Sequence, residues 1–165
     1  ALARADVIVL TRKSASAARA GEVAAAVARL HPAKPVVRCA LLPSRLVPLH
    51  GGAAMALDAL AGRGVLAVAA LATPGPFFAQ LRERGAEVHP AAYPDHHPFS
   101  ADDARTLVQR AAGRMLVMTH KDAVKLRALL PASADAWVLE QRVAMEDGED
   151  VLETALRRAL REPGG

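Results

Sequence analysis

Residues 64–71 read GVLAVAAL, and this uninterrupted apolar run decides the fold class of the chain. Such a run, rich in valine and alanine, is typical of a strand that is buried on both faces of a parallel sheet. Thr73-Pro74 follows it, and we expect a helix to begin there with the threonine as N-cap and the proline at the first helical position. That helix should end at Gly85 and bury three side chains, those of Phe77, Phe78 and Leu81.

The same alternation of short apolar runs with segments of helical periodicity continues on both sides of this unit. It predicts an α/β fold, here a Rossmann-like three-layer sandwich with a mostly parallel sheet of about five or six strands. The candidate strands are residues 6–11, 36–42, 64–71, 86–89, 114–119 and 137–144, with the second ending at Pro43. The expected helices follow Ser16 as far as His31, occupy residues 53–60, begin at Ser100 and Thr119, and span 150–161. Because no repeat or linker interrupts the pattern, we expect a single α/β domain over residues 1–165.

The composition fits one compact domain and argues against disorder, because 52% of the 165 residues are hydrophobic and 23% are charged. Cys39 is the single cysteine, which excludes an intrachain disulfide and a cysteine-based metal cluster and favours a reducing compartment. No apolar run reaches the roughly 18 residues that would span a bilayer, and we expect no signal peptide at the start of this sequence. Because the chain opens on alanine just before a predicted strand, we expect a fragment of a longer protein.

The chain is basic, with a formal net charge of +4. A basic surface attracts phosphates of any kind, so an anionic lipid or a nucleotide is one interpretation, and solvated helix faces are the other. Nucleic acid fits less well, since aromatic residues make up only 3% of the chain and are not interleaved with the basic ones.

A polar loop between two prolines carries Asp95-His96-His97, the most chemically versatile triplet in the sequence. Histidine titrates nearest to neutral pH, and a carboxylate partner can orient the imidazole and raise its basicity. Such a base could take a proton from a sugar hydroxyl as the hydroxyl attacks a phosphoryl group. The alternatives are that the three side chains only hold the loop together, or that His96 and His97 join His89 at a metal ion.

Thr119-His120-Lys121-Asp122 stands where a predicted strand ends and a helix begins, and α/β sheets bind ligands at such places. The helix N-terminus favours an anion, so Lys121, Asp122, Thr119 and Lys125 are candidate substrate- or phosphate-binding residues. Asp122 fits an N-terminal cap better than a catalytic role, and a pair of solvated lysines is the alternative. No Gly-x-x-x-x-Gly-Lys-Ser/Thr run occurs, so the chain has no Walker-type loop for a nucleoside triphosphate.

Three motifs stand in register between residues 73 and 126. They are Thr73-Pro74-x-x-Phe77-Phe78-x-x-Leu81-x-x-x-Gly85-Ala86-Glu87-Val88, Tyr93-Pro94-Asp95-His96-His97, and Thr119-x-Lys121-Asp122-Ala123-Val124-Lys125-Leu126. Their order and spacing resemble the second half of the tetraacyldisaccharide 4′-kinase family, and residues 5–12 are similar to the strand that follows the family's nucleotide-binding part. The chain departs from the family pattern at His120, where glutamate is usual, and at Ala70-Leu71-Ala72, where a strand end with glycine is usual.

The resemblance implies the C-terminal part of a two-part kinase that transfers the ATP γ-phosphate, with Mg²⁺, to the 4′-hydroxyl of tetraacyldisaccharide 1-phosphate in lipid A biosynthesis. It also implies an N-terminal P-loop domain as partner, with an aspartate that pairs with His96, while Asp95 and His97 organise the loop. The expected location is cytoplasmic and peripheral at the inner membrane. Without the Walker-containing part, we expect this fragment to bind no cofactor and to be inactive alone. The alternatives are a standalone binding or regulatory domain and a metal-dependent phosphoesterase that uses Asp95-His96-His97.

Overall fold

The computed structural model describes residues 2–161, and contacts between Cα atoms divide the chain into two compact units. Unit 1 comprises residues 1–42 and 142–165, and unit 2 comprises residues 43–141. Strands β2 (Val36–Pro48) and β6 (Ala136–Asp147) run through both units. Because these two strands belong to both units, the expectation of one α/β domain stays a prediction.

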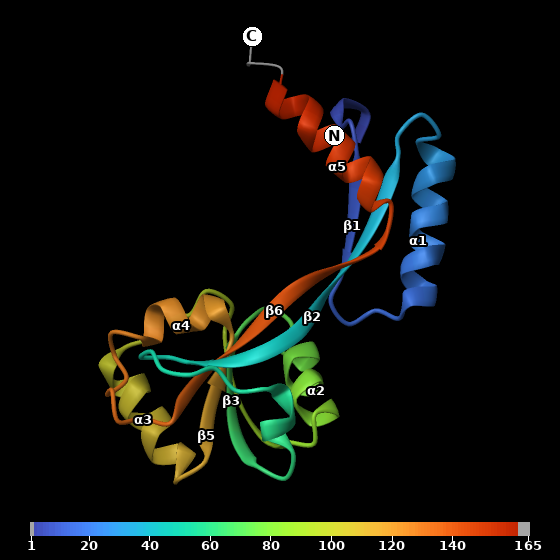
Figure 1. Ribbon diagram of the computed structural model, residues 1–165. Coiled ribbons are helices and arrows are strands. Elements are labelled where there is room, and N and C mark those ends of the chain that lie inside the picture. Colours follow the sequence, from blue (N-terminus) through green and yellow to red (C-terminus); the bar gives the residue numbers. More distant parts are fainter. Residues whose placement is uncertain (1, 162–165) are drawn as a thin grey trace. The chain divides into compact units, whose positions relative to one another are not determined.

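Unit 2 is a three-layer α/β sandwich built on the predicted central strand (Figure 1). Strand β3 (Gly64–Ala70) pairs in parallel with β4 (Glu87–Tyr93) on one side and with β5 (Met115–Met118) on the other. Strand β5 pairs in parallel with β6. The helices are η2 (Leu57–Leu60), α2 (Gly75–Glu83), α3 (Ala101–Ala111) and α4 (His120–Leu126).

The core of unit 2 has two parts, because successive residues of a strand point to opposite faces of a sheet. Leu66 and Val68 of β3 pack with residues of α3 and α4. Val65, Ala67 and Ala69 pack instead with Phe77, Phe78 and Leu81 of α2 and with η2. The uninterrupted apolar run of β3 is therefore explained by helices on both faces, as the sequence predicted.

Unit 1 contains β1 (Ile8–Arg12), α1 (Ala17–Leu30), α5 (Glu149–Arg161), the short helix η1 (Leu2–Arg4), and the unit 1 portions of β2 and β6. Strands β1 and β2 are parallel, with Ile8 opposite Val36. The full strand order is β1-β2-β6-β5-β3-β4, so the six predicted strands are present in one sheet. The pairings of β1 with β2, of β3 with β4 and β5, and of β5 with β6 are parallel, which confirms the α/β class with a mostly parallel sheet.

Three local predictions are wrong. Strand β2 does not stop at Pro43, since the Ser44 hydroxyl donates to the Glu140 carbonyl at 3.2 Å and the strand continues to Pro48. Residues 53–60 form only the short 3-10 helix η2, because Met55 pairs with Leu46 in an isolated antiparallel bridge. Thr73 does not cap α2, which uses Pro74 as N-cap without a side-chain hydrogen bond.

The other helix signals are confirmed by the hydrogen bonds at the helix ends. The side chains of Ser16, Ser100 and Thr119 cap α1, α3 and α4. At α3 the capping box is complete, because the Asp103 carboxylate also accepts from the Ser100 N–H at 2.8 Å. Gly85, with φ of 79°, follows α2 in the left-handed conformation that glycine adopts without strain.

Candidate functional site

The two polar motifs of the sequence meet at one edge of unit 2. Strands β3, β4 and β5 are neighbours and parallel, so their carboxyl ends lie at the same edge of the sheet. The loop with Asp95-His96-His97 follows β4, and α4 follows β5 directly. This is the edge at which open α/β sheets bind ligands.

Lys121 is the direct link between the motifs. Its Nζ donates to Asp95 Oδ1 at 2.6 Å and to the carbonyl oxygen of Ala70 at 3.3 Å. The hydrogen bond from Lys121 lowers the pKa of Asp95 below its usual value. The side chains are 35% and 39% exposed, so the ion pair is accessible from solvent. Lys121, at the start of α4, thus connects the loop after β4 to the end of β3.

His97 anchors the other side of the loop. Its ring contacts the rings of both Tyr93 and Phe99, with ring centroids 4.7 and 5.0 Å away, and its Nε2 is 3.1 Å from Asp103 Oδ2. Hydrogen bonds from the Ser100 backbone and hydroxyl, and then from His97, lower the pKa of Asp103. Lys125 Nζ donates to the His97 carbonyl oxygen at 2.9 Å. The side chain of His97 is therefore engaged on several sides.

His96, between these two anchors, is presented to solvent. Its side chain is 79% exposed, and its Nε2 lies 3.7 Å from Asp95 Oδ2. Its φ is 60°, in the left-handed region that residues with a side chain seldom adopt. The backbone N–H of His96 donates to Asp95 Oδ1 at 3.0 Å, which helps to hold this conformation. The imidazole that the sequence singled out is thus open to a ligand or to another polypeptide.

Asp122 has a different position, because its side chain is fully buried. One carboxylate oxygen, Oδ2, accepts from the Thr119 hydroxyl at 2.7 Å and from the Ala70 N–H at 3.2 Å, while Oδ1 is buried without a partner among the described atoms. The Asp122 N–H in turn donates to Thr119 Oγ1 at 3.2 Å. Thr119 and Asp122 therefore join the end of β3 to the start of α4, and a direct role for them in substrate binding stays a prediction.

The sequence did not predict that Asp103 also contacts the His97 imidazole, or that the His97 ring packs against Tyr93 and Phe99. The capping box identified Asp103 as a helix cap, but nothing in the spacing of His97 and Asp103 shows that the same carboxylate reaches the imidazole. Tyr93 stands two residues before the triplet and Phe99 two residues after it, and this spacing is the only local signal for their ring contacts.

The fold and this edge define an α/β protein with an exposed histidine loop at the carboxyl ends of parallel strands, where open α/β sheets usually bind ligands. The family model for tetraacyldisaccharide-1-P 4′-kinase (LpxK) matches residues 1–161, and the chain belongs to this family.

Two relatives illustrate the likeness. The tetraacyldisaccharide 4′-kinase of Aromatoleum aromaticum is 37% identical over 135 residues, covering 81% of this chain and 38% of the relative. The enzyme of the same name from Anaeromyxobacter dehalogenans is 38% identical over 162 residues, covering 94% of this chain and 43% of the relative. The chain thus spans about two fifths of the length of these relatives.

A solved structure shows the same fold. LpxK from Aquifex aeolicus, crystallised in complex with ATP, aligns with 92% of this chain and 52% of its own length at a TM-score of 0.53 and 19% identity. At this level of identity, the likeness confirms the fold and assigns no residue roles.

Proposed function

We propose that this chain is the C-terminal part of an ATP-dependent kinase that phosphorylates the 4′-hydroxyl of tetraacyldisaccharide 1-phosphate in lipid A biosynthesis. Support comes from the family match over residues 1–161 and from the activity that the relatives' names state. The activity belongs to the longer enzyme, because the sequence of this chain contains no Walker-type loop. Alone, the chain should transfer no phosphate.

The exposure of His96 between two anchored neighbours is the observation that carries the proposal. Lys121 holds Asp95, while Asp103 and Lys125 hold His97 on the other side. Because its neighbours are held in this way, the backbone of His96 keeps its position when a substrate arrives, so less conformational freedom is lost in reaching the reactive geometry. His96 is therefore the side chain of this triplet best placed to act at a site completed by the P-loop domain.

The chemistry assigned to His96 is help with a proton transfer. As the 4′-oxygen attacks the γ-phosphorus of ATP, its proton passes to an aspartate of the P-loop domain that is paired with the His96 imidazole, and ADP leaves with the bond to the γ-phosphorus broken. The pairing favours the charged carboxylate that accepts the proton. Asp95 and His97 organise the loop, and Lys121 and Lys125 combine loop anchoring with a positive charge near the phosphates.

In the intact enzyme, we expect magnesium to be bound together with ATP. Among residues 2–161, no group of three or more His, Cys, Asp and Glu side chains is arranged to hold a metal ion. This observation gives no support to a phosphoesterase that would bind metal at Asp95-His96-His97.

We place the enzyme in the cytoplasm, peripheral at the inner membrane, because its proposed substrate is a lipid. None of the helices in the described part of the chain combines the length and apolar character needed to cross a bilayer.

The test is phosphate transfer from ATP to tetraacyldisaccharide 1-phosphate, measured with a polypeptide of the relatives' full length that contains this chain. We expect His96→Ala to lower kcat by a factor of about 100 or more, the usual range for loss of acid–base assistance. His50→Ala, which also removes an exposed imidazole from unit 2, is the matched control and should leave kcat unchanged. Unchanged turnover in His96→Ala, with an intact fold, would remove His96 from the mechanism.

A further inference from the structure

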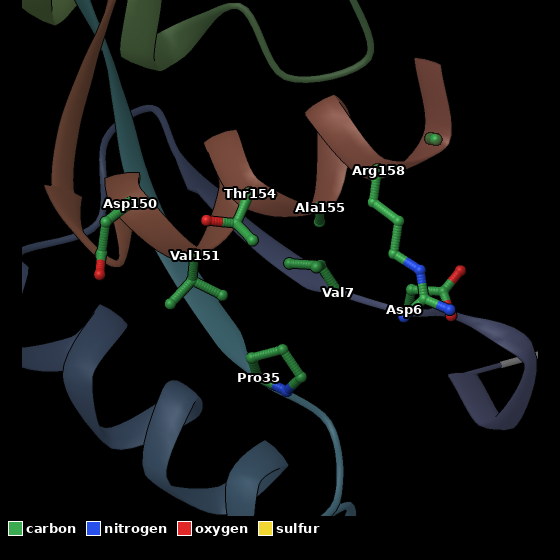
Figure 2. A pocket seen from close by; sticks show the side chains of 9 residues that line it. Asp6, Val7, Pro35, Asp150, Val151, Thr154, Ala155 and Arg158 are labelled. Atoms are coloured by element: carbon green, nitrogen blue, oxygen red, sulfur yellow. The ribbon is translucent and has the colours of Figure 1, made fainter. Parts of the chain in front are cut away.

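Polar side chains gather in each of the two units. In unit 1, a pocket of about 500 Å³ lies beside α5 (Figure 2). Its charged lining residues are Asp6, Asp150 and Arg158, so charges of both signs occur on its wall and the wall favours no class of ligand. In unit 2, by contrast, Lys121 and Lys125 of α4 both reach the same short segment of chain.

Helix α4 is held in place by the core of unit 2 although it has only seven residues. A helix of this length is marginal by itself, and its stability in a protein comes from packing. Asp122, Ala123 and Leu126 are its buried residues. The Asp122 carboxylate also accepts the N–H of Ala70 at 3.2 Å, and Ala70 is the last residue of β3. The start of α4 is therefore fixed to the end of the central strand.

The two lysines stand one helical turn apart, so their side chains leave the same side of α4. Lys121 Nζ donates to Asp95 Oδ1 at 2.6 Å, and Lys125 Nζ donates to the carbonyl oxygen of His97 at 2.9 Å. Asp95 and His97 are the residues immediately before and after His96. The two lysines thus hold the chain on both sides of the exposed imidazole.

Lys121 is also fixed at a second point, because its Nζ donates to the carbonyl oxygen of Ala70 at 3.3 Å. Lys121 and Asp122, consecutive residues of α4, therefore bind both backbone groups of Ala70. An ammonium group with two acceptors at fixed places has less freedom than a solvated one. The position of Asp95 is in this way set by the end of β3.

The contact of Lys121 with Asp95 bears directly on the backbone of His96. Asp95 Oδ1 is the acceptor of Lys121, and the same oxygen accepts the His96 N–H at 3.0 Å. His96 has φ of 60°, a conformation that persists where surrounding contacts hold it. Loss of Lys121 would release the Asp95 carboxylate and weaken the support of this conformation.

We propose that Lys121 and Lys125 are positioning residues for the His96 imidazole and act through Asp95 and His97. This inference rests on the proposed function, in which His96 assists a proton transfer. The other role for a lysine at this edge is direct contact with a phosphate group. Positioning fits the geometry better, because both ammonium groups already have protein acceptors within 3.3 Å.

The kinetic test uses a polypeptide of the relatives' full length that contains this chain. We expect Lys121→Met and Lys125→Met each to lower kcat by about tenfold or more with KM nearly unchanged, since a misplaced imidazole weakens the transition state and not substrate binding. Lys121→Arg, which keeps a donor for Asp95, should recover part of the activity. Arg127→Met removes an exposed cation at the end of the same helix and is the matched control, with kcat and KM unchanged.

A double mutant separates positioning from phosphate contact. In a protein that already carries His96→Ala, Lys121→Met should cause no further loss of kcat, because no imidazole is left to position. A loss as large as in the wild type would show that Lys121 acts independently of His96 and would overturn the proposal. A rise in KM without a loss of kcat in Lys121→Met would overturn it as well, since that result indicates contact with a substrate.

A measurement on the 165-residue chain tests positioning without any activity. The ¹⁵N order parameter of the His96 backbone N–H is about 0.85 for rigid backbone and below about 0.6 for flexible backbone. We expect a rigid value in the wild type and in Arg127→Met, and a flexible one in Lys121→Met. An unchanged order parameter in Lys121→Met would overturn the proposal. Failure of the proposed function is seen separately, as absence of phosphate transfer to tetraacyldisaccharide 1-phosphate by the full-length protein, whatever the order parameter shows.

Discussion

His96 has a strained backbone, since its φ of 60° belongs to the left-handed region. A residue with a side chain pays roughly 1 kcal/mol there relative to glycine. Strain of this kind persists where surrounding contacts hold it, and here Asp95 and His97 are both held. The cost is consistent with a loop that is shaped to expose one imidazole.

We therefore expect His96→Gly to keep or raise the free energy of unfolding of the chain, by up to about 1 kcal/mol, while abolishing the assistance of the imidazole. His96→Ala keeps the strain and should be close to the wild type in stability. Urea unfolding followed by circular dichroism measures both variants. A clear loss of stability in His96→Gly would show that the imidazole itself holds the loop.

Asp103 should contribute to stability in a pH-dependent way. Its pKa is lowered in the fold by the Ser100 hydrogen bonds and by His97. A carboxyl with a lowered pKa stabilises the fold above its unfolded value near 4, and this contribution is lost as the pH falls through the folded value. The stability that Asp103 contributes is therefore lost at acidic pH.

The variant Asp103→Asn should consequently be less stable than the wild type at pH 7, by about 1 kcal/mol as for a weakened N-cap. Its stability should also fall less steeply between about pH 5 and about pH 2. Thermal unfolding at a series of pH values measures this, with Asp102→Asn, an exposed neighbour on α3, as control. Parallel pH curves for wild type and Asp103→Asn would contradict the linkage.

The junction between strand β3 and helix α4 depends on one buried carboxylate, that of Asp122. Asp122 Oδ2 accepts from the Ala70 N–H and the Thr119 hydroxyl, so it links a strand end to a helix start. Removing it leaves a buried N–H without a partner, which is costlier than losing an exposed hydrogen bond.

Asp122→Ala should therefore lower the free energy of unfolding by about 2 to 3 kcal/mol. Asp58→Ala, in the short helix η2, removes an exposed carboxylate from unit 2 and should change stability by less than about 0.5 kcal/mol. Urea unfolding of both variants at pH 7 gives the comparison. If Asp122→Ala left the free energy of unfolding unchanged, solvent would have to replace the contacts of Asp122 with Ala70 and Thr119.

For the whole chain, the two units should differ in local stability. Both core clusters belong to unit 2, whereas unit 1 has four buried hydrophobic residues in its described part. Regions with few buried contacts open at a lower free energy than the global one.

Hydrogen exchange of the isolated 165-residue chain should show this difference directly. Amides of β3 and β5 should exchange at least a hundredfold more slowly than those of α1 and α5. Peptide-level mass spectrometry at pH 7 measures the rates. Equal protection of α1 and β5 would show that unit 1 is stable without a further partner.

The sequence by itself determined the α/β class, the central strand, the caps of α1, α3 and α4, and the motifs that resemble the family. These features depend on local hydrophobic periodicity and on hydrogen bonds that reach three residues along the chain, as for Ser100 and Asp103. Only the tertiary structure decided that β2 continues through Pro43, that Lys121 fastens Asp95, and that Asp103 reaches His97. The physical reason is that the contacts behind these features join different elements, and local periodicity does not record which side chains meet across a fold.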